Sequence, residues 1–386
     1  MGKLKILPTI VDMFAGLNGL SKGDSMVVPG PQVAMKTLPT LGDSPAQMYS
    51  TGSVSLGSGA YLECKTGQKA EFNHSLGALI VELGKGDSFH VRQLNCDEKS
   101  GFYDCRKGLE GYFNKDGFKP LDRIEALYAG DTHASVSDDL VIKATYTAAD
   151  SICNVLRPKQ VVHGDLMSTT TVSHHDEHDY LRRIAKHAAG KASLEDEFNT
   201  TMDLLRKITP ADTVVNIISS NHNDHVYKYL TTINPHKDLV NAKIYHKLMY
   251  LMIEAVEKSA DKETYPNLMQ LWIANSQYAD MLDMLRFHGR RASFAIMGIE
   301  CGMHGDKGAN GAKGSPNGFS MLPTKCIVGH SHSPSIRLGC YTVGTTSRKD
   351  LPYTGGPSSW MHSHCIIYPN GKRQMINVIN GKWRAD

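Results

Sequence analysis

The sequence lacks long apolar runs. Across its 386 residues, no stretch approaches the roughly 18 uncharged apolar residues of a membrane-spanning helix. The apolar run at the N-terminus is too short and too interrupted for a secretory signal. Low-complexity tracts and internal repeats are also missing, while hydrophobic residues make up 41% of the chain and charged residues 21%. These features exclude fibrous, disordered and membrane-spanning proteins and predict a globular protein of the cytosol.

Paired cysteines are also missing. The eight cysteines are scattered through the chain without a CxxC pair. This spacing excludes a zinc ribbon and a small disulfide scaffold, so we expect reduced thiols that are mostly buried.

The small net charge of +3 hides an asymmetry along the chain. From Arg286 to the end there are 13 Lys and Arg against 4 Asp and Glu, a net charge of +9, whereas the preceding residues have 29 against 35, a net charge of −6. Clustered cations gain affinity for phosphates by releasing counterions, so the basic C-terminal third suits a polyanionic substrate. A surface that is basic only for solubility would show the same asymmetry.

Two kinds of sequence follow one another along the chain. Residues 1–120 are rich in Gly, Pro and Ser and contain short β-type runs, which predict a β-rich accessory region. Residues 121–386 alternate short apolar runs with helical stretches, which predicts an α/β domain. The expected buried strands are residues 124–129, 160–162, 213–218, 293–299 and 326–328, the expected helices are residues 177–207, 239–258 and 267–288, and residues 366–379 are expected to form a hairpin.

Residues able to bind metals follow each expected strand. The clusters are GDTH after residue 129, HGDL after 162, SSNHNDH after 218, ECGMHGD after 299 and GHSH after 328. Because strands of an α/β sheet deliver their carboxyl ends to a common crevice, we expect these clusters to form one site. Alternate residues of an extended segment point to the same side, so the D-x-H and H-x-H spacings favour convergence. The candidate site residues are Asp131, His133, Asp165, Asn221, His222, His304, His330 and His332.

Taken together and in this order, the five clusters resemble the motifs of the calcineurin-like metallophosphoesterase superfamily. The resemblance covers about residues 124–345. It implies a layered α/β/β/α sandwich and two divalent metal ions. His222 would lie beside the metal pair as proton donor to the leaving group. One ion would be held by Asp131, His133 and His332, the second by Asn221, His304 and His330, and Asp165 would bridge the two.

The same residue types have a chemical rationale. Two cations about 3.5 to 4 Å apart neutralise phosphoryl oxygens and lower the pKa of a bound water, and a shared carboxylate holds them at that distance. Imidazole, carboxylate and amide ligands without thiolates favour Mn²⁺, with Zn²⁺ or Fe as alternatives. Neighbouring histidines leave some assignments open: His225 and His236 compete with Asn221 and His222, and His288 competes with His304.

Two motifs depart from the family pattern. The second, Gly164 to Ser168, lacks the Asp or Asn and the Arg of the protein-phosphatase branch and resembles the nuclease branch, typified by repair exonucleases that process DNA ends. The third, Ser220 to Asp224, keeps the Asn-His pair but lacks the glycine and displaces the acid by one position. As a whole, the chain resembles the early-expressed, host-DNA-degrading proteins of T5-like phages, which implies action on DNA in the cytoplasm of an infected bacterium.

Basic residues around the fourth and fifth clusters are candidates for binding substrate phosphates. The loop from Gly302 to Gly318 contains six glycines and could close over a phosphate backbone. A His- and acid-rich loop at residues 174–179 could hold a further ion, although a solvated helix start explains the same composition. The candidate phosphate-binding residues are Arg286, Arg290, Arg291, Lys307, Lys313, Arg337, Arg348 and Lys349.

The leading hypothesis from the sequence is a metal-dependent DNase with DNA as its partner, no membrane partner and a homo-oligomeric assembly. The first alternative is a phosphoprotein phosphatase or small-molecule phosphodiesterase that uses the same metal centre. The second alternative is a non-catalytic DNA-binding or scaffold protein in which the metal centre has only a structural role. The missing Arg after Asp165 counts against the phosphatase, and the complete ligand set counts against the scaffold.

Overall fold

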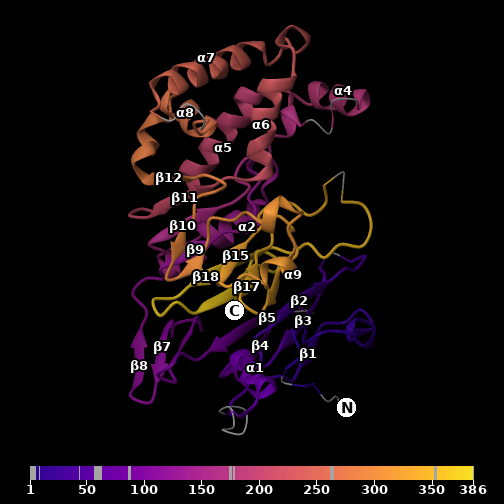
Figure 1. The fold of residues 1–386 in the computed structure, drawn as a ribbon, viewed down its shortest axis with the longest axis vertical. Helices are drawn as coiled ribbons and strands as arrows, with labels where there is room; N and C mark the ends of the chain where they lie inside the picture. Colours follow the sequence, from indigo (N-terminus) through magenta and orange to yellow (C-terminus); the bar gives the residue numbers. More distant parts are fainter. Residues whose placement is uncertain are drawn as a thin grey trace.

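The computed structural model describes most of the chain, namely residues 6–7, 9–42, 44–55, 63–85, 88–173, 176, 179–260, 265–351 and 354–385. These residues form a mixed α/β fold with two large sheets and two small ones (Figure 1). Most of the helices gather at one end of the molecule, and the N-terminal strands lie at the other (Figure 1). The expectation of a mixed α/β protein is therefore confirmed.

A six-stranded sheet contains the strands that precede the first three motifs. Its order is β12-β11-β10-β9-β18-β19. Strands that are covered on both faces need apolar side chains on both, which explains the nearly uninterrupted apolar runs in the sequence. Four strands run parallel, and the last two form the expected hairpin: β9 (Ala126–Tyr128), β10 (Gln160–His163), β11 (Val214–Ile218), β12 (Leu285–His288), β18 (Ser363–Ile367) and β19 (Arg373–Asn377).

An eight-stranded sheet carries the last two motifs and includes strands from both ends of the chain. Its order is β1-β3-β2-β16-β17-β15-β14-β13. The N-terminal strands join it through the antiparallel pairing of Met35 in β2 with Ile336 in β16. The division into residues 1–120 and 121–386 stays a prediction. The strands are β1 (Met26–Val28), β2 (Met35–Leu38), β3 (Ala46–Ser50), β13 (Ala295–Ile296), β14 (Ile299–Glu300), β15 (Cys326–Val328), β16 (Ser335–Arg337) and β17 (Cys340–Thr342).

The smaller sheets come from the N-terminal region and agree with its β-type sequence. They are the hairpin of β4 (Gly77–Leu83) and β5 (Phe89–Asn95) and the three-stranded sheet of β6 (Phe102–Asp104), β7 (Gly111–Asn114) and β8 (Gly117–Pro120).

The α-helices are α1 (Lys65–Asn73), α2 (Asp139–Ile142), α3 (Ile152–Leu156), α4 (Tyr180–Ala188), α5 (Leu194–Ile208), α6 (Asn221–Thr232), α7 (Ala242–Lys258), α8 (Leu268–Ala274) and α9 (Pro316–Phe319).

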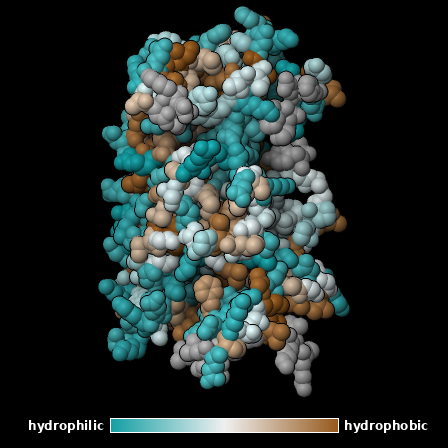
Figure 2. All heavy atoms as spheres, in the orientation of Figure 1, coloured by the Kyte–Doolittle hydropathy of each residue, from teal (hydrophilic) through white to brown (hydrophobic). Residues whose placement is uncertain are grey.

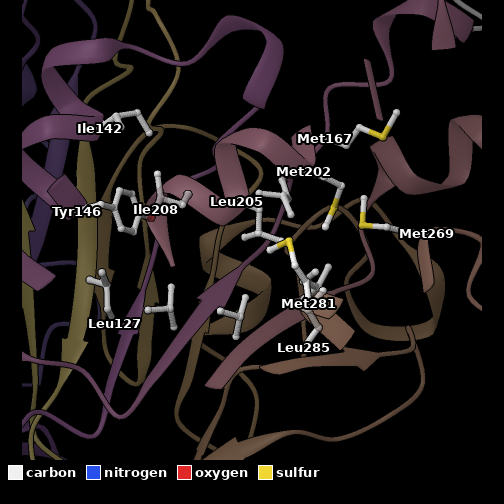
Figure 3. Packing of buried hydrophobic residues seen from close by; sticks show 14 of the residues in the cluster. Leu127, Ile142, Tyr146, Met167, Met202, Leu205, Ile208, Met269, Met281 and Leu285 are labelled. Carbon is white, nitrogen blue, oxygen red and sulfur yellow. The ribbon is translucent and has the colours of Figure 1, made fainter. Parts of the chain in front are cut away.

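The main core lies between the helices and one face of the six-stranded sheet. Leu127 of β9 belongs to a buried cluster that also contains Leu205 of α5 and Met269 of α8 (Figure 3). In the same cluster, the Phe198 and Trp272 rings stack with centroids 4.5 Å apart. Each fully buried aliphatic side chain stabilises the fold by about 1.5 to 3 kcal/mol. This packing confirms that the methionine-rich helical segments belong to the core.

A second core lies on the opposite face of the same sheet. Tyr128 of β9 and Val162 of β10 belong to a cluster that includes Ile327 of β15 and Ile336 of β16. Successive side chains of a strand point to opposite faces, so Tyr128 faces this cluster while its neighbour Leu127 faces the helices. The two large sheets therefore share apolar contacts, which brings the loops at their strand ends close together.

Three of the expected helices and strands differ in the structure, and helices α1 and α6 were not among the predictions. The expected helix 267–288 ends early, and its last residues form β12, in which Leu285 pairs with Val215 of β11. The i, i+4 spacing of Met281 and Leu285 looks helical, but pairing with the sheet edge overrides this local pattern. The expected strand 293–299 turns back at Met297 and Gly298, both with positive φ, and forms β13 and β14.

The expected helix 177–207 is the third difference. It divides into α4 and α5 at Gly190, whose φ of +66° is a left-handed conformation that ends helices. In Figure 1, α4 lies at the side of the helical end. None of its residues is buried, whereas α5 buries seven residues against the main core.

The surface and the cysteines agree with the composition. Figure 2 shows hydrophilic residues over much of the visible face, with apolar residues scattered among them. Within the described parts of the chain, no helix has the length and apolar character needed to cross a bilayer. All eight cysteines are free thiols, and six of them are buried, as expected.

Candidate metal centre

The five predicted clusters meet where the two large sheets come together. Asp131 and Asp165 follow β9 and β10 of the six-stranded sheet, whereas His304 and His330 follow β14 and β15 of the eight-stranded sheet. Side chains from both sheets nevertheless approach one another closely. The expected convergence therefore occurs, but across two sheets rather than at the edge of one.

Three overlapping groups of side chains have the geometry of a metal site. In each group, the candidate ligand atoms all lie within 4.8 Å of one another. Asp165 and His133 each belong to two of the groups. The groups are Asp131 with His133 and His332, Asp165 with His304 and His330, and Asp165 with His133 and His222.

Asp131 organises the first group. Its Oδ2 lies 3.3 Å from Nε2 of His332, and the Nε2 atoms of His332 and His133 are 3.1 Å apart. The same Oδ2 accepts a hydrogen bond of 2.6 Å from the backbone N–H of His330. Two imidazoles that turn their nitrogens toward one carboxylate offer lone pairs and negative charge to a common point, which suits a cation.

Asp165 organises the second group. Its Oδ2 is 3.0 Å from His304 Nε2 and 3.8 Å from Nε2 of both His133 and His222. Asn221 joins this side through its Oδ1, which lies 3.1 Å from Nδ1 of His330. The seven residues predicted as metal ligands and the predicted proton donor thus lie in one continuous cluster. Their individual roles stay predictions.

The backbone at the site is held in an unusual conformation. His133, His330 and His332 have φ values of +45°, +71° and +56°, in the left-handed region that residues with a Cβ rarely adopt. Such conformations cost about 1 to 3 kcal/mol each and persist where the surrounding structure enforces them, often at functional sites.

Two glycines make room for Asp131. A Cβ on Gly329 would lie 2.4 Å from Asp131 Oδ1, and a Cβ on Gly164 would lie 3.0 Å from the same atom and 2.8 Å from His304 Nδ1. The glycines of the HGDL and GHSH clusters therefore permit close approach of backbone to the buried carboxylate.

Burial and charge at the site fit a pair of cations. Asp131 and Asp165 are fully buried, and among the described residues the Oδ1 atom of each has no hydrogen-bond partner. Leaving such atoms unpaired is costly unless a cation binds them. Burial lowers the pKa of His304, but Asp165 and Asp131 outweigh burial and raise it to about 9. A divalent ion would take the place of that proton.

The His222 ring is oriented by the loop after Asp165. Its Nδ1 donates a hydrogen bond to the backbone carbonyl of Ser168, which leaves Nε2 facing Asp165. His222 lies in the first turn of α6, whose N-cap Ser220 accepts a hydrogen bond from the backbone N–H of Asn223. The side chain of His222 is 22% exposed, so the ring borders the cluster and can meet a substrate.

The competing histidines lie outside the three groups. His225 is buried beside Thr169, with its Nδ1 3.2 Å from the threonine Oγ1. His236 is exposed in the turn Pro235–Lys237, and His288 Nε2 lies 2.9 Å from Asn216 Oδ1. The structure therefore brings together the residues that the motifs selected and not these neighbours.

Several residues that support the site were not predicted from the sequence. His364 of β18 accepts a hydrogen bond from the backbone N–H of Gly130, and Trp360 packs on His332 with ring centroids 4.2 Å apart. Thr345 Oγ1 donates to the backbone carbonyl of Asp131. His364 forms an H-x-H pair with His362, the same spacing as in the GHSH cluster, so the sequence did contain a signal that the predictions did not use.

Two of the predicted phosphate-binding residues point away from the site. Arg286 donates to the backbone carbonyls of Asp283 and Leu285, back toward the start of β12. Arg337 forms an ion pair with Asp12. It lies opposite Cys340 of β17, and Cys340 in turn lies opposite Cys326, the first residue of β15. Arg337 is therefore at the end of β15 that is far from His330. Basic residues flanking a motif in sequence therefore do not all flank it in space.

The remaining candidates lie on segments that lead to the site. Lys307 and Lys313 are exposed and pair across an antiparallel bridge in the loop after His304. The backbone N–H of Arg348 donates to Val136, three residues after His133, and Lys349 follows it. Arg291 is exposed next to Arg290, whose guanidinium contacts Asp224 and Asp306.

The loop at residues 174–179 is described only in part. His174, His175, Glu177 and His178 lie outside the described residues. Asp176 pairs with Arg182, with Nη1 and Oδ1 3.0 Å apart, and with Lys186. The carboxylate of Asp176 is thus neutralised by the helix that follows, which favours the helix-start interpretation of this loop.

Comparison with known proteins assigns the chain to a family. The sequence matches no protein-family model. Over 397 aligned residues it is 32% identical to Protein A1 of Escherichia phage T5, and the alignment covers 100% of this chain and 69% of the relative. The chain belongs to the family of phage T5 Protein A1. This membership confirms the phage relationship that the whole sequence indicates.

Proposed function

We propose that this protein is a two-metal phosphodiesterase that hydrolyses DNA. The observation that carries the proposal is the meeting of Asp131 and Asp165, both fully buried, with five imidazole rings from segments that follow strands of the two large sheets. We further propose that the fold is the α/β/β/α sandwich of the calcineurin-like metallophosphoesterases. The shared apolar contacts of the two large sheets support that layering.

The candidate ligands divide into two sets joined by one carboxylate. When bound, two divalent ions would neutralise phosphoryl oxygens and supply a nucleophile from water at neutral pH. Mn²⁺ suits the imidazole, carboxylate and amide donors, as do Zn²⁺ and Fe. Asp131, His133 and His332 would hold one ion, Asn221, His304 and His330 the other, and Asp165 would bridge them.

His222 would supply the proton for the leaving group. The Ser168 carbonyl accepts from Nδ1 and fixes the ring, so Nε2 faces the cluster and can give a proton to an oxygen there. General acid catalysis of this kind contributes about 10² to 10⁴ in rate.

Two observations support DNA as the substrate. Lys307 and Lys313 are exposed and lie opposite each other on the loop after His304, where like charges are unfavourable and a bound phosphate would offset their repulsion more fully than Asp224, which lies 3.6 Å from Lys307 Nζ. The relative is a phage protein, which supports a role in degrading host DNA in the cytoplasm of an infected bacterium. We also propose that the protein acts as an assembly of identical copies.

A set of three substrates tests the proposal. The protein would be incubated with Mn²⁺ and, separately, with plasmid DNA, bis-p-nitrophenyl phosphate and p-nitrophenyl phosphate, with EDTA as the control. We expect cleavage of the plasmid and of the diester, and none in EDTA. Turnover of the monoester alone would favour a phosphatase, and no hydrolysis of any of the three substrates would favour a scaffold.

Neutralising the lysine pair should weaken DNA binding. Because each phosphate contact releases counterions, the Lys307→Ala, Lys313→Ala double variant should reduce the slope of log affinity against log salt by about 1.8. The measurement is binding of a duplex in EDTA at several salt concentrations. Alanine at Lys107 and Lys115, which are exposed between strands β6 and β8, is the matched control. An unchanged slope in the Lys307→Ala, Lys313→Ala variant would show that these lysines do not contact DNA phosphates.

A further inference from the structure

Arg290 links two segments that carry candidate ligands. It lies two residues after β12, and its Nη1 is 2.9 Å from Asp306 Oδ1 while its Nη2 is 2.8 Å from Asp224 Oδ2. Asp224 is in the first turn of α6, close to Asn221 and His222, and Asp306 is two residues after His304. One guanidinium therefore joins the third motif to the fourth.

The two linked segments belong to different sheets. The α6 segment follows β11 of the six-stranded sheet, and the His304 segment follows β14 of the eight-stranded sheet. Among the described residues, no backbone hydrogen bond joins the first turn of α6 to residues 302–306. The direct contacts between them are therefore made by side chains, namely those of Arg290 with both carboxylates and a longer contact of 3.6 Å between Lys307 and Asp224.

The first ligand set is held differently. The backbone N–H of Asp131 donates to Gly344, and its carbonyl accepts from Thr346, so backbone hydrogen bonds tie this loop to the segment after β17 of the other sheet. The N–H of His330 adds a bond to the Asp131 side chain. Removing one ion-paired side chain near α6 should leave these contacts in place.

The chemistry of Arg290 suits a link rather than a phosphate ligand. Its side chain is 22% exposed, and both of its partners are carboxylates, of which Asp306 is 8% exposed. The planar fork of a guanidinium can bond two carboxylates at once, whereas a lysine ammonium is a single point of charge. A phosphate at Arg290 would have to displace two existing ion pairs.

We infer that Arg290 is a positioning residue that sets the spacing of Asn221 and His304 and thereby selectively supports binding of the second metal ion. This inference rests on the proposed two-metal site and assigns Arg290 a role other than binding substrate. Residues that orient metal ligands typically change metal affinity by about 10- to 100-fold when mutated.

Calorimetric titration of the full-length protein with Mn²⁺ tests the inference. In Arg290→Ala, we expect the affinity for the first ion to be retained and that for the second to fall by about 10- to 100-fold. Arg290→Lys should show a smaller loss, because one of the two carboxylates can still be contacted. Asp224 is half-exposed, so Asp224→Asn should not disturb folding. This variant should also bind the second ion more weakly than the wild type does.

Arg92 provides the matched control. It is also an arginine held by two carboxylates, Asp104 at 2.6 Å and Glu82 at 2.5 Å, but it lies in the β4–β5 hairpin. Arg92→Ala should leave both affinities unchanged. Unchanged affinity for both ions in Arg290→Ala and Asp224→Asn would overturn the inference, and so would an equal loss at both sites. A wild-type protein that binds no pair of ions would instead reject the proposed function itself.

Discussion

Replacing Asp165 with asparagine should abolish paired metal binding and reduce hydrolysis of DNA by about 10³-fold. That loss corresponds to about 4 kcal/mol of transition-state stabilisation. Asparagine preserves the shape of the side chain but removes the charge that faces His304, His133 and His222. Without that charge, nothing at this position offsets the repulsion between two divalent ions.

Thermal unfolding with and without Mn²⁺ separates this effect from a general loss of stability. A ligand at 100 times its dissociation constant stabilises the native state by about 2.7 kcal/mol per site. The wild type should therefore gain stability from two ions, and Asp165→Asn should gain less than half as much. Asp104→Asn is the control, because Asp104 is also buried and ion-paired but lies far along the chain in β6. An Asp165→Asn protein with the full Mn²⁺-dependent gain would show that Asp165 does not bridge.

The convergence of the candidate ligands could be predicted because strand ends carry a strong local signal. A short apolar run such as residues 213–218 must be buried, so the polar cluster that follows it has to lie at a strand end. Asp131, Asp165 and His304 were selected in this way, and they lie together. The glycines at 164 and 329 belong to the same motifs and give the backbone room beside Asp131.

The division of those strand ends between two sheets could not be predicted. Strands β14 and β15 contain only two and three residues, and the Cys-Ile-Val of β15 is as apolar as the Ala-Leu-Tyr of β9. Which sheet a short apolar strand joins depends on its pairing partners, such as Cys340 of β17 for Cys326 of β15, and not on its own residues alone. The joining of β2 to β16 across about 300 residues of chain is a non-local choice of this kind.

The ion-pair partners of the basic residues also could not be predicted from the sequence. Arg286, Arg290 and Arg337 all lie near motifs, yet two of them bond carboxylates and one bonds backbone carbonyls. A basic residue counts toward substrate binding only when its own neighbours leave the charge available, and those neighbours come from distant segments. The exposed Lys307 and Lys313 meet that condition better than these three arginines, because the Asp224 carboxylate that pairs with Lys307 lies at 3.6 Å, longer than the ion pairs of Arg290 and Arg337.

Replacing His222 with alanine should reduce hydrolysis of DNA by about 10²- to 10⁴-fold while two metal ions still bind. The ring lies at the border of the cluster, with Nδ1 committed to Ser168 and Nε2 directed toward Asp165. Its loss therefore removes a proton donor and leaves the other candidate ligands in place. His236→Ala, at the exposed histidine that competes with it in sequence, should keep the wild-type rate.

The leaving group distinguishes proton donation from metal binding by His222. An alkoxide leaving from DNA needs a proton, whereas p-nitrophenolate is stable without one, so His222→Ala should lose at least about tenfold less activity on bis-p-nitrophenyl phosphate than on DNA. His222 also shares a group of candidate ligands with His133 and Asp165. If the ring bound a metal ion instead, the variant would lose activity on both substrates equally and would bind fewer ions in a Mn²⁺ titration. Comparing the two substrates together with the metal content therefore decides which of these roles the histidine has.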